Sequence, residues 1–186
     1  MSDTSTGNGK VVVNRSMSLD GFTAGPGDAM NWIFDFMGPM EDEFPEIMAA
    51  TGAMLIGRRT HEVGNRMAAD KPDSTDYPLS GPVFVLTHEP PDPPDPGVTF
   101  LTGDIGEAVA TARSAASGKN LEILGADVAG QCLRRGLVDE ILVYVLPVLL
   151  GDGIRFSSPG LARIDLEPVS STRSGAVTIL RFRVRK

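Results

Sequence analysis

Short apolar runs alternate with helix-compatible segments along most of the chain. The runs are rich in Val, Ile and Leu and carry few charges, which is typical of strands that are covered on both faces of a sheet. Such strands require helices on both sides, and the intervening segments supply them. The predicted strands are Lys10–Met17, Ala53–Gly57, Pro82–Thr87, Val98–Leu101, Leu121–Leu124 and Glu140–Val148.

Helical periodicity is clearest after Asp104, where apolar residues recur every three or four positions. Asp104 and Glu107 have the spacing of a capping box, and Gly118 suits the left-handed end of a helix. Elsewhere, Pro39 and Pro45 must lie at or near helix starts. The predicted helices are Asp35–Thr51, Arg58–Met67, the segment that follows Asp104, and Ala126–Arg135, which Gly136 closes.

Two polar connections separate these elements. The loop Ala69–Gly81 is rich in Asp, Ser and Pro, and loops of that length are usually functional lids or disordered segments. Pro90–Pro96 is expected to be a stiff, extended connector. Residues 1–9 are polar and acidic and are expected to form a disordered tail, which leaves 10–186 as a single domain of ordinary length.

Two antiparallel strands are predicted to close the chain, Ala162–Ser174 and Ala176–Arg185, around a turn at Ser174-Gly175. Alternation in the second strand places arginines on one face, which we expect to meet solvent or a partner. The arginines are Arg181, Arg183 and Arg185, and the opposite face carries Ala176, Thr178, Leu180, Phe182 and Val184. With the alternating strands and helices before it, this pair predicts an α/β fold with a mixed, mostly parallel sheet.

Composition narrows the class of protein. A formal net charge of -7 and a pI near 4.8 argue against a nucleic-acid or anionic-membrane binder. No apolar run reaches the ~18–20 residues of a membrane span, and the N-terminus lacks the features of a secretory signal. The single cysteine, Cys132, fits a reducing, cytoplasmic compartment and is expected to be a small core residue. No Cys/His cluster indicates a metal site.

The most informative stretch is a strand-to-helix junction formed by Gly57, Arg58, Arg59 and Thr60. The free N–H groups of a first helical turn and the helix dipole favour an anion, and arginine can bond two phosphate oxygens at once. A solvated helix start is the alternative interpretation. Positive charge at a helix N-terminus is unfavourable, however, so the arginines favour a bound anion that compensates this cost.

Two further strand ends resemble this junction. Small residues where a strand meets a helix let the backbone approach a ligand, although a tight turn also needs them. In open α/β sheets, ligands bind outside the carboxyl ends of the strands, so all three strand ends are expected on one rim. The second end consists of Gly125, Ala126, Asp127 and Val128, and the third of Thr87 and His88.

Five motifs occur in an order that resembles a known family. They are Ser18-Leu19-Asp20-Gly21-Phe22, Gly57-Arg58-Arg59-Thr60, Pro82–Leu86, Gly125-Ala126 and Pro147–Gly153. Together they resemble the C-terminal reductase domain of the bifunctional riboflavin-biosynthesis deaminase/reductase, and more broadly the stand-alone dihydrofolate-reductase-like proteins. The resemblance covers about Val11–Phe156. It implies a three-layer dihydrofolate-reductase-like fold, NADPH as the cofactor and a homodimer.

The resemblance also implies roles for individual residues. Gly57, Arg58, Arg59 and Thr60 would contact the cofactor phosphates, with the arginines near the 2′-phosphate that separates NADPH from NADH. Thr87 and His88 would lie near the adenosine half. The backbone of Gly125, Ala126, Asp127 and Val128 would hold the pyrophosphate and ribose.

Three residues near the N-terminal turn are candidates for the substrate end. The resemblance places Asp20 near the nicotinamide, as the candidate catalytic residue that handles a proton, whereas an Asp in a turn is often simply a turn-former. Phe22 and Trp32 are candidates for walls of a substrate pocket. A hydrophobic flap over the core is the alternative interpretation.

The sequence departs from the family pattern in three ways. The acidic residues Glu41, Asp42, Glu43 and Glu46 give no clear match to the carboxylate that assists pterin protonation in dihydrofolate reductases, so folate reduction is not supported. The zinc-binding Cys and His residues of the deaminase domain are missing. Extra basic residues for a phosphorylated riboflavin precursor are not identified.

The leading hypothesis is an NADPH-dependent reductase that transfers a hydride to a small heterocyclic or carbonyl/imine substrate, related to 5-amino-6-(5-phosphoribosylamino)uracil reductase. The alternative is a non-catalytic NADP(H)-binding protein that has lost its substrate site. A third hypothesis is an interaction protein that assembles through its C-terminal strands, and dimerisation would not exclude catalysis.

Overall fold

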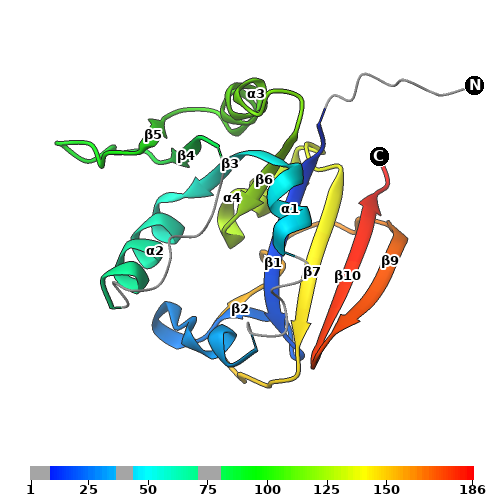
Figure 1. Ribbon diagram of the computed structural model, residues 1–186. Helices are drawn as coiled ribbons and strands as arrows, with labels where there is room; N and C mark the ends of the chain where they lie inside the picture. Colours follow the sequence, from blue (N-terminus) through cyan, green and yellow to red (C-terminus); the bar gives the residue numbers. More distant parts are fainter. Residues whose placement is uncertain (1–8, 37–43, 71–80) are drawn as a thin grey trace, which may run out of the picture.

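One sheet of eight strands organises the molecule, in the order β5-β4-β3-β6-β1-β7-β10-β9 (Figure 1). The computed structural model describes residues 9–36, 44–70 and 81–186. The strands of the sheet are β1 (Val11–Ser18), β3 (Thr51–Gly57), β4 (Val83–Leu86), β5 (Val98–Leu101), β6 (Asn120–Leu124), β7 (Glu140–Leu146), β9 (Leu166–Ser174) and β10 (Val177–Val184). A second, two-stranded sheet pairs β2 (Phe22–Ala24) with β8 (Ile154–Arg155).

Most neighbours in the large sheet run parallel. β5, β4, β3, β6, β1 and β7 pair in parallel, and β10 pairs antiparallel with both β7 and β9. The predicted mixed, mostly parallel sheet is therefore confirmed. Because parallel strands end at the same edge of a sheet, the ends of β3, β4 and β6 lie beside one another.

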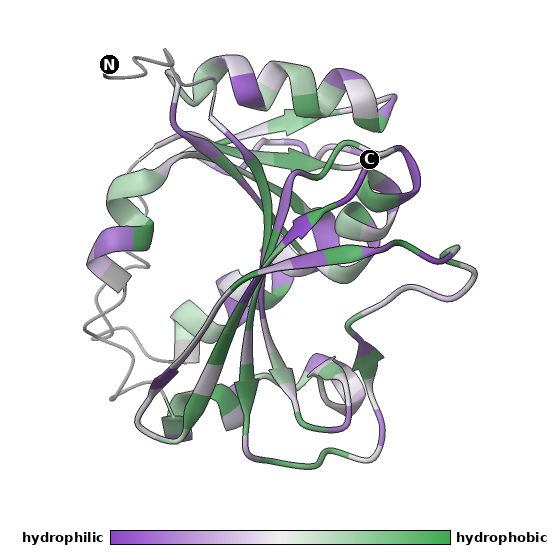
Figure 2. Cartoon of the chain, turned by 90° about the vertical axis from the view of Figure 1, so that its right-hand side faces the viewer, coloured by the Kyte–Doolittle hydropathy of each residue, from purple (hydrophilic) through white to green (hydrophobic). Residues whose placement is uncertain are grey.

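Helices cover both faces of the sheet and produce three layers. Figure 2 shows helical segments on both sides of the twisted sheet and hydrophobic residues concentrated along its strands. The face that bears most of the core is covered by α3 (Ile105–Ala115) and α4 (Ala126–Arg134). The opposite face is covered by α1 (Phe44–Ala50), α2 (Arg58–Asp70) and the short 3-10 segments η1 (Pro26–Asp28) and η2 (Asn31–Phe36).

The core between the sheet and α3 and α4 is fully apolar at its centre. Leu55, Leu121 and Ile123 have no exposed surface there, and each buried side chain of this size contributes about 1.5–3 kcal/mol. Cys132 is buried in the same cluster, and burial raises the pKa of its thiol to about 12. A thiol that resists ionisation is a packing residue, as the sequence predicts.

The helix signals after Asp104 are confirmed. Asp104 is the N-cap of α3, and its carboxylate accepts a hydrogen bond from the Gly106 N–H at 2.8 Å. Gly118 and Gly136 follow α3 and α4 with φ angles of 81° and 63°, the left-handed conformation that ends a helix.

Several predicted boundaries are wrong. Thr51 begins β3 instead of ending a helix, because its hydroxyl donates to the Ile47 carbonyl at 2.8 Å and so closes α1. Within the predicted helix Asp35–Thr51, η2 ends at Phe36 and α1 covers Phe44–Ala50. Pro39, Glu41, Asp42 and Glu43 lie outside the described residues.

Three other ends differ by a few residues. β7 ends at Leu146, because Pro147 has no N–H for the ladder. β9 begins at Leu166, four positions after the predicted start. α2 continues through Ala69 to Asp70, so the predicted loop starts later than expected, and residues 71–80 lie outside the part that the structure describes.

The predicted faces of the last strand are wrong in part. Val177 and Ile179, which share the Arg181 side, are buried, whereas Leu180 and Phe182 are only half-buried. Both faces of β10 contribute to a core, with Val177 and Ile179 in one cluster and Val184 in the other. Arg181 reaches the buried Glu140 at 3.3 Å, which lets an arginine share an otherwise apolar face.

Two classes of feature are absent from residues 9–36, 44–70 and 81–186. None of the helices there has both the length and the apolar composition needed to cross a bilayer. No group of three His, Cys, Asp or Glu side chains in these segments is placed to hold a metal ion.

Candidate active site

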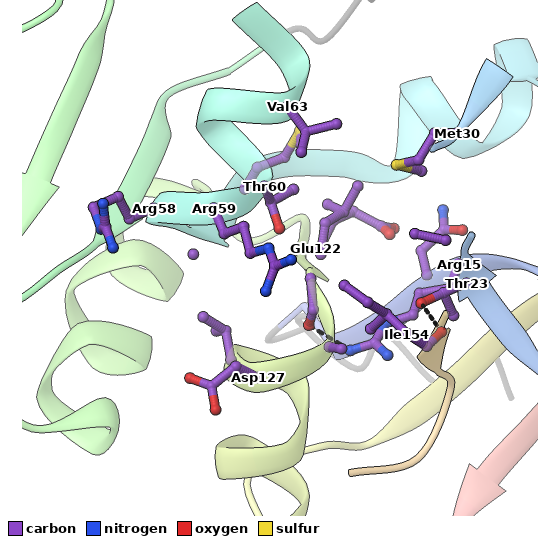
Figure 3. Close-up of a pocket in the computed structure, with 18 of the residues that line it drawn as sticks. Arg15, Thr23, Met30, Arg58, Arg59, Thr60, Val63, Glu122, Asp127 and Ile154 are labelled. Carbon is purple, nitrogen blue, oxygen red and sulfur yellow. Dashed lines mark hydrogen bonds between the residues drawn. The ribbon is translucent and has the colours of Figure 1, made fainter. Parts of the chain in front are cut away.

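A cavity of about 530 Å³ lies at the carboxyl ends of β3, β4 and β6. This volume is typical of small-molecule sites, which lie at this edge in open α/β sheets. In Figure 3, Glu122 lies between two groups of lining residues. One group consists of Arg58, Arg59 and Asp127, and the other of Arg15, Thr23, Met30 and Ile154.

The structure brings together every residue that the sequence predicts for the cofactor. The parallel register of β3, β4 and β6 places their ends on one rim, which is what the strand-end argument requires. The contact of these residues with a dinucleotide stays a prediction. The lining includes Gly57, Arg58, Arg59, Thr60, Thr87, His88, Gly125, Ala126, Asp127 and Val128.

The first two junctions pack directly against each other. Gly125 has a φ of 93°, which L side chains rarely adopt, and a Cβ there would collide with Thr60 Oγ1. A Cβ at Gly57 would lie 3.1 Å from Val128 Cγ2. The two helix starts can therefore meet because position 125 is glycine, and Gly57 leaves little room for a larger residue beside Val128.

The first turn of α4 has unpartnered backbone donors. Its first helical hydrogen bond runs from the Ala129 N–H to the Gly125 carbonyl at 3.2 Å, so the N–H groups of residues 126–128 have no partner within the helix. No side chain caps this helix at Gly125. An anion at the start of α4 would satisfy these donors and complement the helix dipole.

Arg15 holds the Gly125 peptide in place through a hydrogen bond to its carbonyl group. Its guanidinium is buried, donates from Nη2 to the Gly125 carbonyl, and donates from Nη1 to the Phe156 carbonyl at 2.8 Å. It also lies over the Phe156 ring, 5.3 Å from the centroid. Burial lowers the pKa of Arg15 to about 10, which leaves it charged near neutral pH.

The two arginines of the first junction have different partners. Arg59 forms a two-point ion pair with Asp28, with 2.8 Å from Nε and 2.7 Å from Nη2. This pair raises the pKa of Arg59 and ties α2 to the loop that carries η1. Among the described residues, Arg58 pairs with the exposed Glu62, one turn further along α2, at 2.8 Å. An exposed pair of this kind contributes little, so Arg58 is the readier of the two to meet an anion.

Glu122 is the ionisable group at the middle of the cavity. Its side chain lies on β6, between Val12 of β1 and Met54 of β3 in the register of the sheet, and is 5% exposed. Burial raises the pKa of Glu122 to about 7, against the opposing effect of hydrogen bonds with Asn14 and Thr51. A carboxyl group with this pKa can hold or release a proton near neutral pH.

Apolar side chains make up most of one wall of the cavity. They come from α1, α2, β3 and the segment around η2, which cover this face of the sheet. These residues are Met30, Ile33, Phe34, Ile47, Met48, Met54, Val63 and Met67. A low-polarity wall of this kind excludes water from whatever occupies it.

Asp20 does not line the cavity. Its carboxylate accepts hydrogen bonds from the Ser18 hydroxyl at 2.6 Å, the Gly151 N–H at 2.7 Å and the Leu150 N–H. The Ser18 hydroxyl and these backbone donors lower the pKa of Asp20 to about 2. The carboxylate therefore joins the turn after β1 to the segment after β7. This role agrees with the alternative interpretation of Asp20 as a residue that forms the turn.

Asp20→Asn is expected to make the protein less sensitive to acid. Because the pKa of Asp20 is about 2 in the folded protein and near 3.8 in the unfolded chain, its ionised form stabilises the fold above about pH 4. This contribution is lost as the pH falls through about 2. Thermal melts across this range should show a shallower decline for the variant, and the exposed control Asp92→Asn should follow the wild type.

The two aromatic candidates also lie outside the lining. Phe22 is buried on β2 beneath the Arg155 guanidinium, 4.7 Å from the ring centroid. Trp32 packs against the core on the cavity side of the sheet and donates from Nε1 to the Ala29 carbonyl at 3.1 Å. Met30 and Ile33, on either side of Trp32 in sequence, line the cavity in its place.

Several polar lining residues were not predicted from the sequence, and four of them share one kind of position in the fold. Asn14, Arg15, Thr51 and Glu122 belong to strands that are buried on both faces. A polar residue inside such a strand must point into a core or a site. That interruption of an apolar run is the signal that could have revealed them.

A family model that matches nearly the whole chain shows which sequence family the protein belongs to. The family model of the RibD C-terminal domain matches residues 9–180. The chain belongs to the RibD C-terminal domain family. This membership confirms the resemblance drawn from the five motifs, and RibD C-terminal domain proteins are reductase-like at the family level.

Individual relatives agree with this assignment. The uncharacterised protein YwjB of Bacillus subtilis (strain 168) is 29% identical over 149 residues, which span 78% of this chain and 80% of YwjB. A Shewanella sp. PV-4 protein assigned to riboflavin biosynthesis superposes with a TM-score of 0.79 and 22% identity, over 95% of this chain and 99% of that one.

A dihydrofolate reductase shares the fold. The enzyme from Enterococcus faecalis, solved in complex with NADP(H), superposes with a TM-score of 0.64 at 16% identity, over 96% of this chain and 98% of the reductase. At this identity the likeness concerns the fold alone. The RibD C-terminal domain protein described here therefore has the three-layer dihydrofolate-reductase-like fold that its sequence predicts.

Proposed function

We propose that this protein is an NADPH-dependent reductase that transfers a hydride to a small heterocyclic or carbonyl/imine substrate. The observation that carries the proposal is a single cavity with two unlike ends. One end has two helix N-termini and Arg58, which suit a dinucleotide, and the other has apolar walls around Glu122. Family membership supports a reductase, and the NADP(H)-bound neighbour supports the cofactor.

The residues present fit a dinucleotide. The glycine at position 125 leaves a backbone cradle that a Cβ would fill, beside the unpartnered N–H groups that open α4. These groups suit the pyrophosphate, and Arg58 and Thr60 at the start of α2 suit a further phosphate. Thr87 and His88 close the rim at the end of β4 and would lie beside the adenosine.

The chain's own residues would prepare the site for chemistry. A bound reduced nicotinamide supplies the hydride. The apolar walls exclude water, and Arg15 holds the Gly125 peptide so that the cradle is formed before a ligand arrives. Glu122 is the titratable group of the apolar end and can exchange a proton there.

Arg58→Ala is expected to lower the affinity for NADPH about ten-fold, or roughly 1.4 kcal/mol, and to leave the affinity for NADH nearly unchanged. The reason is that NADH lacks the 2′-phosphate that Arg58 would bond. Thermal-shift experiments compare the affinities for NADPH and NADH, since a ligand at about 100 times its Kd stabilises the protein by about 2.7 kcal/mol. Arg134→Ala, at the far end of α4, serves as the matched control.

Equal stabilisation of the wild type by NADPH and NADH would contradict the role of the arginine. Absence of stabilisation by either dinucleotide would contradict the proposed function as a whole. Binding of NADPH without its oxidation across a panel of imines, carbonyls and heterocycles would instead favour a non-catalytic NADP(H)-binding protein.

A further inference from the structure

The positive charge at the start of α2 is neutralised by carboxylates of the same chain. Arg58 pairs with Glu62, and Arg59 pairs with Asp28. Glu62 lies one turn further along the same helix, whereas Asp28 belongs to η1, 31 positions before Arg59 in the chain. Because positive charge at a helix N-terminus is unfavourable, an anion is expected there. For Arg59, the chain supplies this anion itself.

Asp28 occupies the edge of Arg59 that suits a phosphate best. The guanidinium donates from Nε to Asp28 Oδ2 at 2.8 Å, and Nη2 lies 2.7 Å from Oδ1, which is the paired geometry that arginine also forms with phosphate oxygens. Both residues line the cavity, and Figure 3 shows the Arg59 side chain pointing into it from α2. A second anion on this guanidinium would lie beside the Asp28 carboxylate and be repelled by it. A phosphate and Asp28 therefore compete for Arg59.

Two arginines of α2 share the Asp28 carboxylate. Arg66 lies two turns beyond Arg59, and its Nη2 is 3.9 Å from Asp28 Oδ2. The Asp28 side chain is 13% exposed, whereas that of Arg59 is 67% exposed, so the carboxylate is the enclosed member of the pair. Removal of this one negative charge would leave one unpaired cation in the cavity lining and a second cation beside it.

The backbone at Asp28 is held in a disfavoured conformation. Gly27 and Asp28 both have left-handed φ angles, of 67° and 63°. A residue with a side chain adopts this conformation at a cost, and it persists where surrounding contacts hold it. The ion pairs with Arg59 and Arg66 are the contacts that the structure gives to the Asp28 side chain. Asp28 is therefore poised to move away when another anion takes its place on Arg59.

We propose that Asp28 is an internal competitor for the phosphate on the adenosine ribose of NADPH, and that it sets how strongly the protein distinguishes NADPH from NADH. The apparent affinity for a ligand falls with the fraction of molecules that are competent to bind it. The pair of Asp28 with Arg59 thus lowers the affinity for NADPH. It leaves the affinity for NADH unchanged, because NADH has no phosphate at this position. This inference rests on the proposed function, since it concerns the cofactor of the same cavity.

Two substitutions at position 28 remove the competitor without adding backbone strain. Asp28→Asn keeps the shape but not the charge, and Asp28→Gly removes the side chain, and both new residues tolerate a left-handed φ. Titration calorimetry at fixed ionic strength compares 2′,5′-ADP with 5′-AMP, two probes that differ only in the 2′-phosphate. Asp165→Asn is the matched control, because it removes the same charge from an Asp–Arg pair, with Arg163, outside the cavity lining.

Both Asp28 variants are expected to bind 2′,5′-ADP about five-fold more tightly than the wild type, and to change the affinity for 5′-AMP by less than about two-fold. Asp165→Asn should match the wild type for both probes. When Arg59→Ala is the background, Asp28→Asn should change the affinity for 2′,5′-ADP by less than about two-fold, because the competed guanidinium is gone. Unchanged or weaker binding of 2′,5′-ADP by the Asp28 variants, an equal gain for both probes, or a full gain in the Arg59→Ala background would overturn the proposal.

Measurements with NADPH separate this proposal from the function on which it depends. A gain for 2′,5′-ADP in the Asp28 variants, without NADPH oxidation on any imine, carbonyl or heterocycle, supports the competition and counts against the reductase. NADPH oxidation by the wild type, with no gain in the variants, overturns the competition alone. Failure of the wild type and both Asp28 variants to bind either probe or NADPH would overturn both proposals.

Discussion

Gly125→Ala is expected to lower the free energy of unfolding by about 1–3 kcal/mol and to weaken NADPH binding at least ten-fold. Gly125 has a φ of 93° and a ψ of 138°, a region that is costly for any residue with a side chain. The added Cβ would also collide with Thr60 Oγ1 and lie 3.5 Å from Thr60 Cβ. One methyl group thus strains the backbone and pushes the two junctions apart. Urea unfolding and a dinucleotide titration measure the two effects.

Gly136→Ala is the matched control for this substitution. Gly136 follows α4 with a φ of 63°, and a Cβ there would meet nothing within 4 Å. The control therefore carries the cost of a positive φ, about 1–2 kcal/mol, without the collision and away from the cradle. Its NADPH affinity should equal that of the wild type. If both variants lost affinity equally, general destabilisation would explain the result and the cradle would not.

Arg15→Met is expected to destabilise the fold by about 2 kcal/mol. The substitution keeps an apolar stem but removes the donors to the Gly125 and Phe156 carbonyls, and each unsatisfied buried acceptor costs about 1–3 kcal/mol. Two effects reduce this cost. The Gly125 carbonyl keeps its bond from Ala129, and the depressed pKa of Arg15 shows that burial already disfavours its charge. The loss of the hydrogen bonds to two acceptors is expected to destabilise the fold by more than these two effects offset.

Chemical denaturation of Arg15→Met checks the magnitude, and Arg163→Met supplies the comparison. Arg163 is exposed and pairs only with Asp165 across two residues, so its removal should change stability by less than about 0.5 kcal/mol. A difference below that size between the two variants would mean that the buried guanidinium is not what fixes the Gly125 peptide.

The rim of the site could be predicted because it depends on local order along the chain. A strand that ends at Gly57 before a helix, and another that ends before Gly125, must meet once the strands are parallel neighbours. Hydrophobic periodicity and glycine positions are enough to establish both facts. The direct packing of Thr60 against Gly125 was not predicted from the sequence and is a finding of the structure.

The substrate end could not be predicted in the same way. Asp20 stands in a turn that resembles a catalytic position, but its oxygens are taken by donors from residues 150 and 151, far along the chain. Glu122 interrupts an otherwise apolar strand, but that interruption alone does not show whether the carboxyl group points into a core or a site. The packing of α1 and α2 determines which face of this buried strand opens into the cavity. That packing cannot be inferred from the hydrophobic periodicity of the sequence.

The C-terminal hairpin shows a related difficulty. The alternating arginines of β10 suggested one exposed face, but residues on both faces of β10 are buried, because each face belongs to a different core cluster. Val177 and Ile179 are buried on one side and Val184 on the other. Alternation along a strand therefore does not show which face meets solvent when both faces contact a core.

The position of β1 sets the order in which the protein can be assembled during synthesis. β1 emerges first from the ribosome, yet its partners in the sheet are β6 and β7, with Val12 pairing with Glu122 and Glu140. The middle of the sheet therefore cannot close until the nascent chain extends through Leu146, and Val11–Val13 stay unpaired until β6 and β7 have been synthesised. The cavity at the ends of β3 and β6 is in turn completed only after β6 has been synthesised and has paired with β1 and β3.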